Sequence, residues 1–421
     1  MRNNPLVFLS IFTLIIIAID LYSFRGIKKL IINKNKNFRR IIFYLFWFVP
    51  MILIGGISLF FIYREQIPQN NYLNYFHSIS GFLILFYLPK LIFIIFNLLD
   101  DLVLLFRKIF LHKNNIFNDK DNPVSRRQFL TRAGIITASL PFLSILYGIK
   151  WGRFDFTIRN LNLNFVNLPS EFNGFKIIQI SDFHLGSFIG NEEKIKEVVN
   201  IINEQKADVL LFTGDFVNNV STEIDPFINI LKSLKARIGK YSILGNHDYG
   251  EYVPWNSENE KVKNLERTIE LQKEIGFDVL LNESRKIRIN NSEIDLLGVE
   301  NWGLKPFPQY GDLEKALSNT KDDSFKILLS HDPTHWDEQV LEKTNINLTL
   351  SGHTHGAQFG IEIPGWRWSP VNLRYKRWGG LYKESNQFLY VNTGIGFIGF
   401  PGRVGMPPEI SVIELNRKKT I

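Results

Sequence analysis

Long apolar runs dominate the first third of the chain. Residues 6–23 and 41–63 are almost wholly apolar, and a third apolar run lies within 77–99. Each run is long enough to cross the ~30 Å hydrocarbon core of a bilayer as a helix. A fourth run, 133–149, is shorter and is interrupted by Thr, Ser and Pro. The pattern predicts an all-α membrane region over residues 1–150 with three or four transmembrane helices.

The third run contains polar residues. Pro89 and Lys90 stand in its middle, and Asp100 and Asp101 follow it. One interpretation makes Lys90 part of a polar path through the membrane. The other is a kinked or re-entrant span in which Lys90 extends toward the headgroups or faces a neighbouring helix. The behaviour of long basic side chains in membranes favours the second interpretation.

Basic residues are distributed unevenly between the apolar runs. The segments 24–40 and 107–132 carry seven basic residues each, whereas 64–76 carries only Arg64 and Glu65. Because loops rich in Lys and Arg stay in the cytoplasm, the N-terminus is predicted to lie outside. If the fourth run crosses the membrane, the C-terminal part lies outside as well. If it only lies on the membrane surface, the C-terminal part stays in the cytoplasm.

The hexapeptide at 125–130, Ser-Arg-Arg-Gln-Phe-Leu, resembles the twin-arginine export signal. Such signals are normally N-terminal, and here three apolar runs precede it. Paired arginines also occur by chance beside membrane helices, because basic residues gather on cytoplasmic flanks. The Ser before the pair and the Phe-Leu after it favour a true signal, and with it an extracytoplasmic C-terminal domain.

From about Phe154 onward, short β-branched runs alternate with longer amphipathic stretches. The predicted strands are 175–180, 208–213, 241–244, 278–281, 285–290, 293–299, 325–329, 347–350, 389–392 and 410–415. The predicted helices are 191–205, 224–235, 258–275 and one between 329 and 347. The alternation predicts a mostly parallel sheet first and a second, mixed sheet later. Residues 151–421 are therefore expected to form one α/β domain.

The two regions differ in charge. Residues 1–150 contain 18 Lys and Arg against 6 Asp and Glu, whereas the remaining residues contain 31 against 35. The C-terminal domain thus has no bulk attraction for nucleic-acid phosphates, and no nucleic-acid partner is expected. The chain has no cysteine, which excludes disulfides, thiolate metal sites and cysteine nucleophiles.

Five short segments hold five of the eight histidines of the chain. They are 181–186 (SDFHLG), 213–215 (TGD), 245–248 (GNHD), 330–332 (SHD) and 351–356 (SGHTHG). Each segment follows a predicted strand, at the edge where open α/β sheets build their sites. We therefore expect their polar side chains to converge. The candidate residues are Asp182, His184, Asp215, Asn246, His247, His331, His353 and His355.

Oxygen and imidazole ligands in this number suit two divalent metal ions held close together. Two ions ~3.5–4 Å apart need a shared ligand, and Asp215 on its tight turn is the best candidate. A water that bridges the ions would be deprotonated near neutral pH and attack phosphorus. His247 stands beside a ligand, Asn246, and is interpreted as an acid or charge stabiliser rather than a ligand.

These segments resemble the signature blocks of the calcineurin-like metallophosphoesterase superfamily, over about residues 154–416. Further segments narrow the resemblance to its membrane-associated bacterial branch: 352–358 (GHTHGAQ), 363–365 (IPG), 394–396 (GIG) and 403–409 (RVGMPPE). That branch includes exported phosphoesterases with twin-arginine signals and relatives that hydrolyse UDP-2,3-diacylglucosamine. The resemblance implies a four-layer α/β/β/α sandwich and a place in the bacterial inner membrane.

The resemblance also implies roles for single residues. One metal ion would be held by Asp182, His184, Asp215 and His355. The other would be held by Asp215, Asn246, His331 and His353. His247 would be the catalytic histidine. Asn218 departs from the pattern, because relatives often have Asp there (Gly-Asp-x-x-Asp). If that Asp orients the histidine, another group must do so here, and Asp248 is one candidate.

Other candidate features concern the metal and the substrate. Mn²⁺, Zn²⁺ and Fe²⁺ all suit the expected ligands. Arg403 could bind a substrate phosphate, or it could be an exposed arginine without a role. A basic-aromatic stretch could meet lipid headgroups or could be ordinary packing; it consists of Trp366, Trp368, Arg374, Arg377 and Trp378.

The favoured function is that of a membrane-anchored, metal-dependent phosphoesterase. It would hydrolyse a phosphomonoester, phosphodiester or pyrophosphate bond of a lipid-linked or cell-envelope substrate. One alternative is a phosphodiesterase for soluble nucleotides that the anchor only localises. Another is a membrane sensor or scaffold with a non-catalytic phosphatase fold, although the full set of ligands argues against it. The expected partners are the lipid bilayer and the phosphate ester, and no protein partner is predicted.

Overall fold

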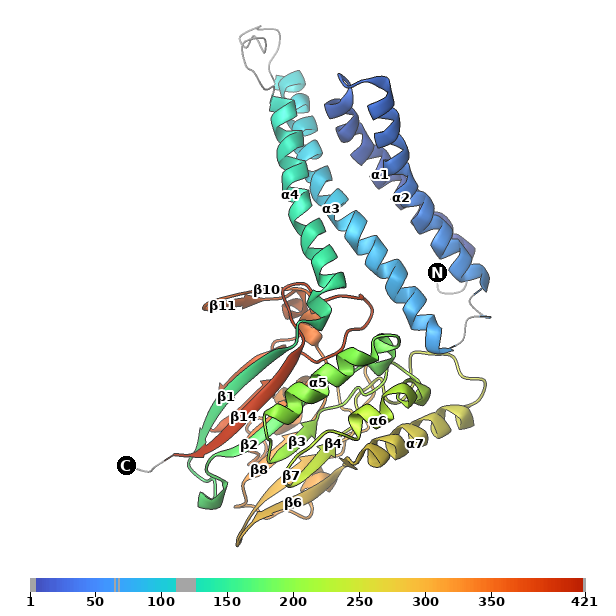
Figure 1. Cartoon of the computed structure of the whole chain (residues 1–421). Coiled ribbons are helices and arrows are strands. Elements are labelled where there is room, and N and C mark those ends of the chain that lie inside the picture. The colour runs from blue at the N-terminus through green and yellow to red at the C-terminus, as the bar shows by residue number, and fades with distance from the viewer. Residues whose placement is uncertain (1–4, 64–65, 67–68, 111–125, 419–421) are drawn as a thin grey trace. The chain divides into compact units, whose positions relative to one another are not determined.

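The computed structural model describes residues 5–63, 66, 69–110 and 126–418 (Figure 1). The chain divides into two compact units, residues 1–149 and 150–421. Apolar helices make up the first unit. Two large β-sheets with flanking helices make up the second unit.

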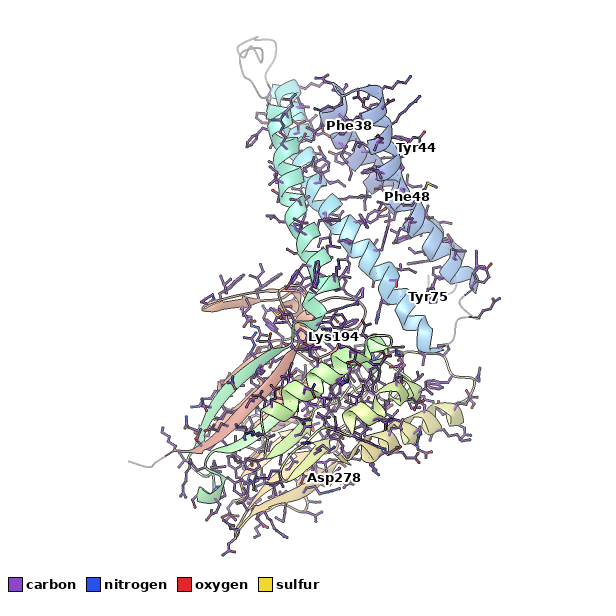
Figure 2. The ribbon with its side chains drawn as sticks, viewed as in Figure 1. Phe38, Tyr44, Phe48, Tyr75, Lys194 and Asp278 are labelled. Carbon is purple, nitrogen blue, oxygen red and sulfur yellow. The ribbon has the colours of Figure 1, made fainter. Side chains whose placement is uncertain are left out.

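The described residues of the first unit form four helices: α1 (Pro5–Ile31), α2 (Lys36–Tyr63), α3 (Gln69–Phe110) and α4 (Arg126–Lys150). Helices α1, α2 and α3 each contain a stretch long and apolar enough to cross a membrane, and a fourth such stretch, Gln128–Phe154, begins in α4 and runs past its end. Phe38, Tyr44 and Phe48 project from α2 (Figure 2) and are 42%, 68% and 59% exposed. Helices that present large apolar side chains outward are typical of a lipid environment.

The twin-arginine-like hexapeptide falls at the start of α4. Its first residue, Ser125, lies outside the described residues, and residues 126–130 belong to the first turns of the helix. The structure therefore describes the apolar segment that follows the paired arginines, and the export signal itself stays a prediction.

Lys90 faces a neighbouring helix. Its ammonium group pairs with the carboxylate of Asp20 on α1, and the Tyr87 hydroxyl donates to the same carboxylate at 2.8 Å. The Asp20 side chain is fully buried. The buried Asp20 carboxylate, paired with Lys90 and hydrogen-bonded to Tyr87, thus links α1 to α3. This arrangement agrees with the interpretation in which Lys90 faces a neighbouring helix.

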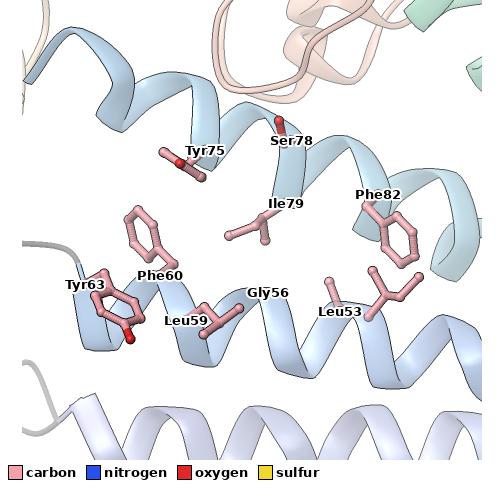
Figure 3. Close-up of a pocket in the computed structure, with 10 residues that line it drawn as sticks. Leu53, Gly56, Leu59, Phe60, Tyr63, Tyr75, Ser78, Ile79 and Phe82 are labelled. Atoms are coloured by element: carbon pink, nitrogen blue, oxygen red, sulfur yellow. The ribbon is translucent and has the colours of Figure 1, made fainter. Parts of the chain in front are cut away.

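An apolar pocket of about 520 Å³ lies between α2 and α3 (Figure 3). Leu53, Leu59 and Phe60 line it from α2, and Ile79 and Phe82 line it from α3. Its lining is almost wholly hydrocarbon, so it suits an apolar occupant and not a charged ligand.

The second unit contains two six-stranded sheets. The first sheet has the order β1-β14-β2-β3-β4-β5, and the second has the order β12-β13-β9-β8-β7-β6. The strands of the first sheet are β1 (Thr157–Phe165), β2 (Phe175–Ile180), β3 (Val209–Phe212), β4 (Gly239–Ser242), β5 (Asp278–Val279) and β14 (Glu409–Arg417). Those of the second are β6 (Glu283–Ile289), β7 (Ser292–Gly298), β8 (Lys326–Leu329), β9 (Leu348–Ser351), β12 (Gly380–Glu384) and β13 (Gln387–Val391). A separate hairpin consists of β10 (Ile361–Ile363) and β11 (Trp366–Trp368).

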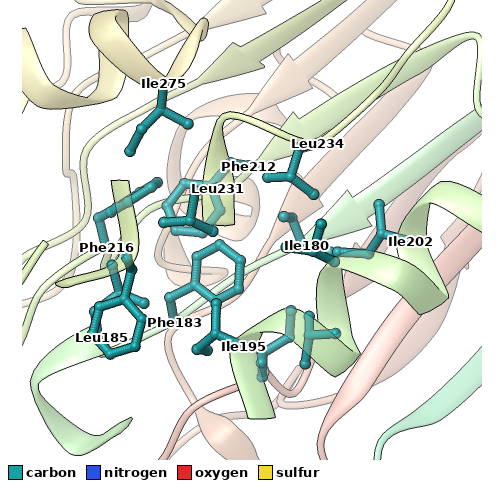
Figure 4. Packing of buried hydrophobic residues seen from close by; sticks show 14 of the residues in the cluster. Ile180, Phe183, Leu185, Ile195, Ile202, Phe212, Phe216, Leu231, Leu234 and Ile275 are labelled. Carbon is teal, nitrogen blue, oxygen red and sulfur yellow. The ribbon is translucent and has the colours of Figure 1, made fainter. Parts of the chain in front are cut away.

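Three apolar clusters fix the order of layers in this unit. The middle cluster joins the facing sides of the two sheets, for example Ile177 and Leu211 with Ile327. A second cluster packs the outer side of the first sheet under α5 (Glu192–Glu204), α6 (Ile228–Leu231) and α7 (Glu258–Ile275) (Figure 4). The third packs the second sheet under α8 (Leu313–Leu317) and the turn at Trp336–Val340. The result is the four-layer α/β/β/α sandwich that was expected.

Several elements differ from the sequence-based expectation. The helix expected over 224–235 is only α6, because two tight turns at Ser221–Glu223 and Asp225–Phe227 precede it. The helix expected between β8 and β9 is a single π-helical turn. β1 was not predicted, although its sequence alternates Asn with Leu and Phe. It is an edge strand that pairs in parallel with β14, more than 240 residues away in the chain.

Candidate metal centre

The candidate ligands lie at one edge of both sheets. β2, β3 and β4 run parallel as neighbours in the first sheet, and β8 and β9 do so in the second. Asp182, Asp215 and Asn246 follow the carboxyl ends of the first three strands, while His331 and His353 follow those of the other two. Parallel strands therefore deliver residues from distant parts of the sequence to one place.

The turns that carry these ligands have unusual backbone geometry. Five non-glycine residues have left-handed conformations, with φ of +52° at Asp182, +47° at His184, +62° at Asp215, +73° at His353 and +50° at His355. Such conformations cost about 1–3 kcal/mol each and cluster at functional sites. The turns are also tightly packed, since a Cβ atom at Gly214 would stand 2.6 Å from the backbone nitrogen of Gly245.

Asp182, His184 and His355 form the first of two buried clusters, with ligand atoms within 4.8 Å of one another. Nε2 of His184 is 3.0 Å from Nε2 of His355. Nε2 of His355 is in turn 3.2 Å from Oδ1 of Asp182. Two imidazole nitrogens and a carboxylate oxygen thus point at a common position.

The second cluster consists of Asp215, His331 and His353. Oδ2 of Asp215 is 3.1 Å from Nε2 of His331, which is 3.3 Å from Nδ1 of His353. The same Asp215 oxygen lies 3.6 Å from Nε2 of His184 in the first cluster. Asp215 therefore stands between the clusters, where a ligand shared by two ions would have to be.

Neighbouring groups fix the orientation of the histidine rings. The second ring nitrogens meet the Val217 carbonyl at 3.2 Å (His184), the Thr213 carbonyl at 2.7 Å (His331) and the Tyr375 hydroxyl at 2.8 Å (His353). A ring N–H that donates to such an oxygen leaves the other nitrogen unprotonated and available to a metal ion. The two carbonyls thus favour the ligating tautomers of His184 and His331, and the Tyr375 hydroxyl can accept from His353 in the same way.

Asn246 supplies an independent sign of a cation. Its Nδ2 donates to the Tyr252 hydroxyl at 2.8 Å, but its buried Oδ1 has no hydrogen-bond partner among the described residues. Leaving a buried acceptor unpaired costs about 1–3 kcal/mol. An amide oxygen in this position is explained if it serves as a metal ligand.

The electrostatics of the centre also favour cations. Burial alone would raise the pKa of Asp182, but the nearby His355 holds that pKa well below its usual range. His331 lowers the pKa of Asp215 in the same way against the effect of burial. Although burial acts against it, Asp215 raises the pKa of His331 to about 10. Two buried carboxylates thus stabilise positive charge here, and the residues present fit two divalent ions.

Two family models match the chain. Residues 175–357 match "Calcineurin-like phosphoesterase", and residues 2–153 match "Probable Calcineurin-like phosphoesterase, transmembrane domain". The metallophosphoesterase YkuE of Bacillus subtilis (strain 168) is 33% identical over 306 residues, which cover 69% of this chain and 98% of that protein. This chain belongs to the calcineurin-like metallophosphoesterase family. It is accordingly a phosphoesterase hydrolase with a membrane region.

Other relatives extend the similarity. A "Transmembrane protein with metallophosphoesterase domain" of Danio rerio is 30% identical over 291 residues, which cover 67% of this chain and 62% of that protein. A metallophosphoesterase of Campylobacter jejuni is 26% identical over 404 residues, which cover 90% of this chain and 100% of that protein. Among solved structures, phosphopantetheinyl hydrolase from Mycobacterium tuberculosis covers 48% of this chain with 12% identity and a TM-score of 0.30.

In this metallophosphoesterase, a backbone carbonyl orients His247. Nδ1 of the half-buried His247 ring lies 2.7 Å from the carbonyl oxygen of Asn218. The backbone N–H of His247 donates to Oδ1 of Asp215 at 2.8 Å. Although Asn218 stands where relatives often have Asp, the His247 ring still has a hydrogen-bond acceptor, because the main-chain carbonyl provides it. The Asn218 side chain instead bonds Ser187 at 3.2 Å.

The structure gives Asp248 a role that differs from the expected one. Its fully buried carboxylate accepts backbone N–H groups of Gly245 (2.9 Å), Asp215 (3.0 Å) and Phe216 (2.8 Å). It thereby ties the turn after β3 to the turn after β4. The suggestion that Asp248 orients the histidine ring is wrong, since Asn218 does so.

Arg403 also differs from both expectations. Only 2% of it is exposed, and its guanidinium donates to the backbone carbonyls of Gly396 (2.9 Å) and Thr393 (2.8 Å). Another of its nitrogens lies 3.2 Å from Nδ1 of His355. Arg403 therefore stabilises the loop at residues 393–396, next to the first cluster. It is not a surface residue, and it is not placed to meet a substrate phosphate.

Sequence reasoning missed three residues that support the centre. Tyr375 contacts His353, and Tyr252 contacts Asn246 and packs 4.4 Å from the His247 ring. Glu223 is buried and accepts the backbone N–H groups of residues 218, 219 and 220 at 2.5, 3.2 and 3.2 Å. The tyrosines reach the centre only through the fold, and an isolated Glu has no distinguishing sequence signal.

Proposed function

We propose that this metallophosphoesterase hydrolyses a phosphomonoester, phosphodiester or pyrophosphate bond of a lipid-linked or cell-envelope substrate. The observation that carries the proposal is the position of Asp215 between two buried ligand clusters. The family and the membrane region support it.

Two divalent ions, Mn, Zn or Fe, fit the ligand sets. One would be held by Asp182, His184, Asp215 and His355, and the other by Asp215, Asn246, His331 and His353. When bound, such a pair activates water and stabilises the charge that develops during displacement at phosphorus.

His247 is the residue proposed to transfer a proton during the reaction. Its Nδ1–H donates to the Asn218 carbonyl, so its Nε2 is left to serve the reaction. With a second proton on Nε2, the ring would protonate the leaving oxygen or stabilise charge on a phosphoryl oxygen. Asp248 acts indirectly, because it holds the turns that carry Asp215 and His247 in register.

The proposed location is the bacterial inner membrane, with the enzyme domain on the extracytoplasmic side. The basic segments 24–40 and 107–132 support this orientation through the positive-inside rule, and α4 supplies a fourth candidate span. A reporter fused after Ile421 tests it: an exported reporter is expected, and a cytoplasmic reporter would reverse the orientation and argue for a cytoplasmic lipid precursor as substrate.

A substrate comparison tests the activity. The full chain, purified and reconstituted in nanodiscs with Mn²⁺, is assayed with a lipid pyrophosphate, bis-p-nitrophenyl phosphate and cyclic nucleotides. We expect the highest kcat/KM for the lipid, and Asp215→Asn and His247→Ala should abolish hydrolysis. Preference for a nucleotide would indicate a soluble-substrate phosphodiesterase. Hydrolysis of none of them, with both metals bound, would indicate a non-catalytic scaffold.

A further inference from the structure

The β10–β11 hairpin, drawn in Figure 1, has apolar side chains that are exposed to solvent. In its antiparallel register Ile361 pairs with Trp368, and Ile363 pairs with Trp366. Residues at alternate positions and directly opposite one another share one face of a hairpin. These four side chains are 51%, 38%, 54% and 51% exposed in the order named. One face of the hairpin is thus a continuous exposed patch of two Ile and two Trp.

The other face is polar and attaches the hairpin to the domain. Glu362 pairs with Arg367 across the hairpin, and the Arg159 guanidinium on β1 donates to the Glu362 carboxylate at 2.6 Å. The Arg367 guanidinium lies 4.9 Å from the centre of the Trp378 ring, which is 5% exposed. A soluble domain normally buries the apolar face of such a hairpin and exposes the polar face. Here the apolar face is exposed, while the polar face, with Glu362 exposed and Arg367 half-buried, carries the contacts to the domain.

The segment after the hairpin continues the same surface. The turn Pro370–Leu373 ends in Leu373, which is 88% exposed, and Arg374 and Lys376 beside it are exposed. Residues 361–380 contain four basic residues and one acidic residue. Exposed Trp and aliphatic side chains next to cations match a lipid interface with anionic headgroups. Arg377 and Trp378, by contrast, are 5% exposed and belong to the interior.

The chain connection between the fourth candidate span and this unit is short. α4 ends at Lys150 and the next helical turn begins at Gly152, so the single residue between them spans only ~3.5 Å. The chain therefore has no long linker between the fourth candidate span and the first residues of this unit. Two exposed tryptophans beside the exposed Arg374 and Lys376 suit an anionic lipid surface better than a second copy of the chain or a soluble partner.

We propose that the apolar face of β10–β11, together with Leu373 and Arg374, inserts into the interfacial region of the bilayer. The surface joins the metal centre along the chain, because the turn His355–Gln358 precedes β10 and Tyr375 contacts His353. Docking would therefore hold the centre at the level of lipid headgroups. The proposal rests on the membrane anchoring alone and does not depend on which phosphate ester is hydrolysed.

The absence of cysteine makes a direct test possible in the full chain. Ile363→Cys is labelled with the polarity-sensitive fluorophore NBD, and Val262→Cys on α7, 44% exposed, is the matched control. Both proteins are reconstituted at one copy per nanodisc containing phosphatidylglycerol. At position 363 we expect a blue-shifted emission that is quenched by doxyl-labelled lipid and protected from aqueous iodide. The label at 262 should behave as in water.

Iodide quenching at 363 equal to that at 262 would overturn the proposal. Protection that appears only in larger vesicles holding several copies would also overturn it and assign the face to self-association. Far-UV circular dichroism and bound metal must match the unsubstituted protein, so that a misfolded variant is not mistaken for an undocked one. As a second measurement, Arg374→Glu should reduce quenching by doxyl lipid in phosphatidylglycerol discs more than in uncharged ones. An equal effect in both would remove the anionic-lipid part of the proposal.

Discussion

Tyr375→Phe tests the support of one proposed metal ligand, His353. The change removes only the hydroxyl that lies 2.8 Å from Nε2 of His353, and Tyr375 itself is 7% exposed. Burial raises the pKa of Tyr375 above its ordinary value, so the hydroxyl is protonated and acts as a neutral hydrogen-bond partner. The ring stays in place, so that packing is preserved while the His353 N–H loses its acceptor.

The structure allows the loss to be estimated. Removing the partner of a buried ligand histidine typically costs 10–100-fold in metal affinity or activity. Oδ2 of Asp332 lies 3.5 Å from the same nitrogen and is otherwise without a hydrogen-bond partner among the described residues. A small ring movement would therefore recover part of the loss. We expect the affinity of the second ion to fall about tenfold, which corresponds to about 1.4 kcal/mol.

The assay is a metal titration of the stripped protein, read by hydrolysis of bis-p-nitrophenyl phosphate. The curve for Tyr375→Phe should shift to about tenfold higher Mn²⁺, with kcat at saturating metal nearly unchanged. Tyr310→Phe is the matched control, because it removes an exposed hydroxyl 3.0 Å from Glu251. An unshifted curve, or an equal shift in the control, would refute the reasoning. Lower kcat at saturating metal would show that Tyr375 acts on the substrate instead.

Three further outcomes follow from the contacts around the centre. Glu223→Ala leaves the backbone N–H groups of residues 218–220 without their acceptor. The free energy of unfolding should fall by about 2–4 kcal/mol, and kcat should fall because the Asn218 carbonyl that orients His247 is less firmly held. Unchanged stability would show that water replaces the carboxyl. Asn218→Ala should keep kcat within about threefold, because the backbone carbonyl orients His247, and a hundredfold loss would mean that the side chain matters. Burial lowers the pKa of His335 to about 4; since unfolding raises it to about 6.5, stability should fall by about 3 kcal/mol as pH drops from about 6.5 to 4. His335→Gln should remove that slope, and an identical pH profile in the variant would assign the slope to other groups.

Much of the centre could be predicted because it is built from local sequence signals. Most of the proposed ligands follow short apolar strands, and several stand beside glycine. Because the carboxyl ends of parallel strands meet at one edge of a sheet, Asp182, Asp215 and His331 could be expected to lie together. Left-handed backbone at His353 and His355 could not be predicted in this way, since such strain is maintained by the surrounding fold.

The remaining features depend on groups that carry no side-chain signature. The acceptor for His247 is a main-chain carbonyl, which every residue has, so the sequence at Asn218 suggested a defect that the structure does not contain. Arg403 appeared available because glycines and prolines surround it, yet those residues form a loop that encloses it. β1 pairs with a strand at the far end of the chain, and local pattern says little about such partners.

Metal content tests the two-ion account most directly. The full chain is stripped with chelator, reloaded with Mn²⁺, freed of excess metal and measured by elemental analysis, in parallel with Asp215→Asn. We predict about two ions per chain in the reloaded protein and activity that returns only as the second ion binds. The Asp215→Asn protein should bind fewer than two ions per chain and should be inactive. Full hydrolysis with one ion or none, or two ions retained in an active Asp215→Asn protein, would contradict the account.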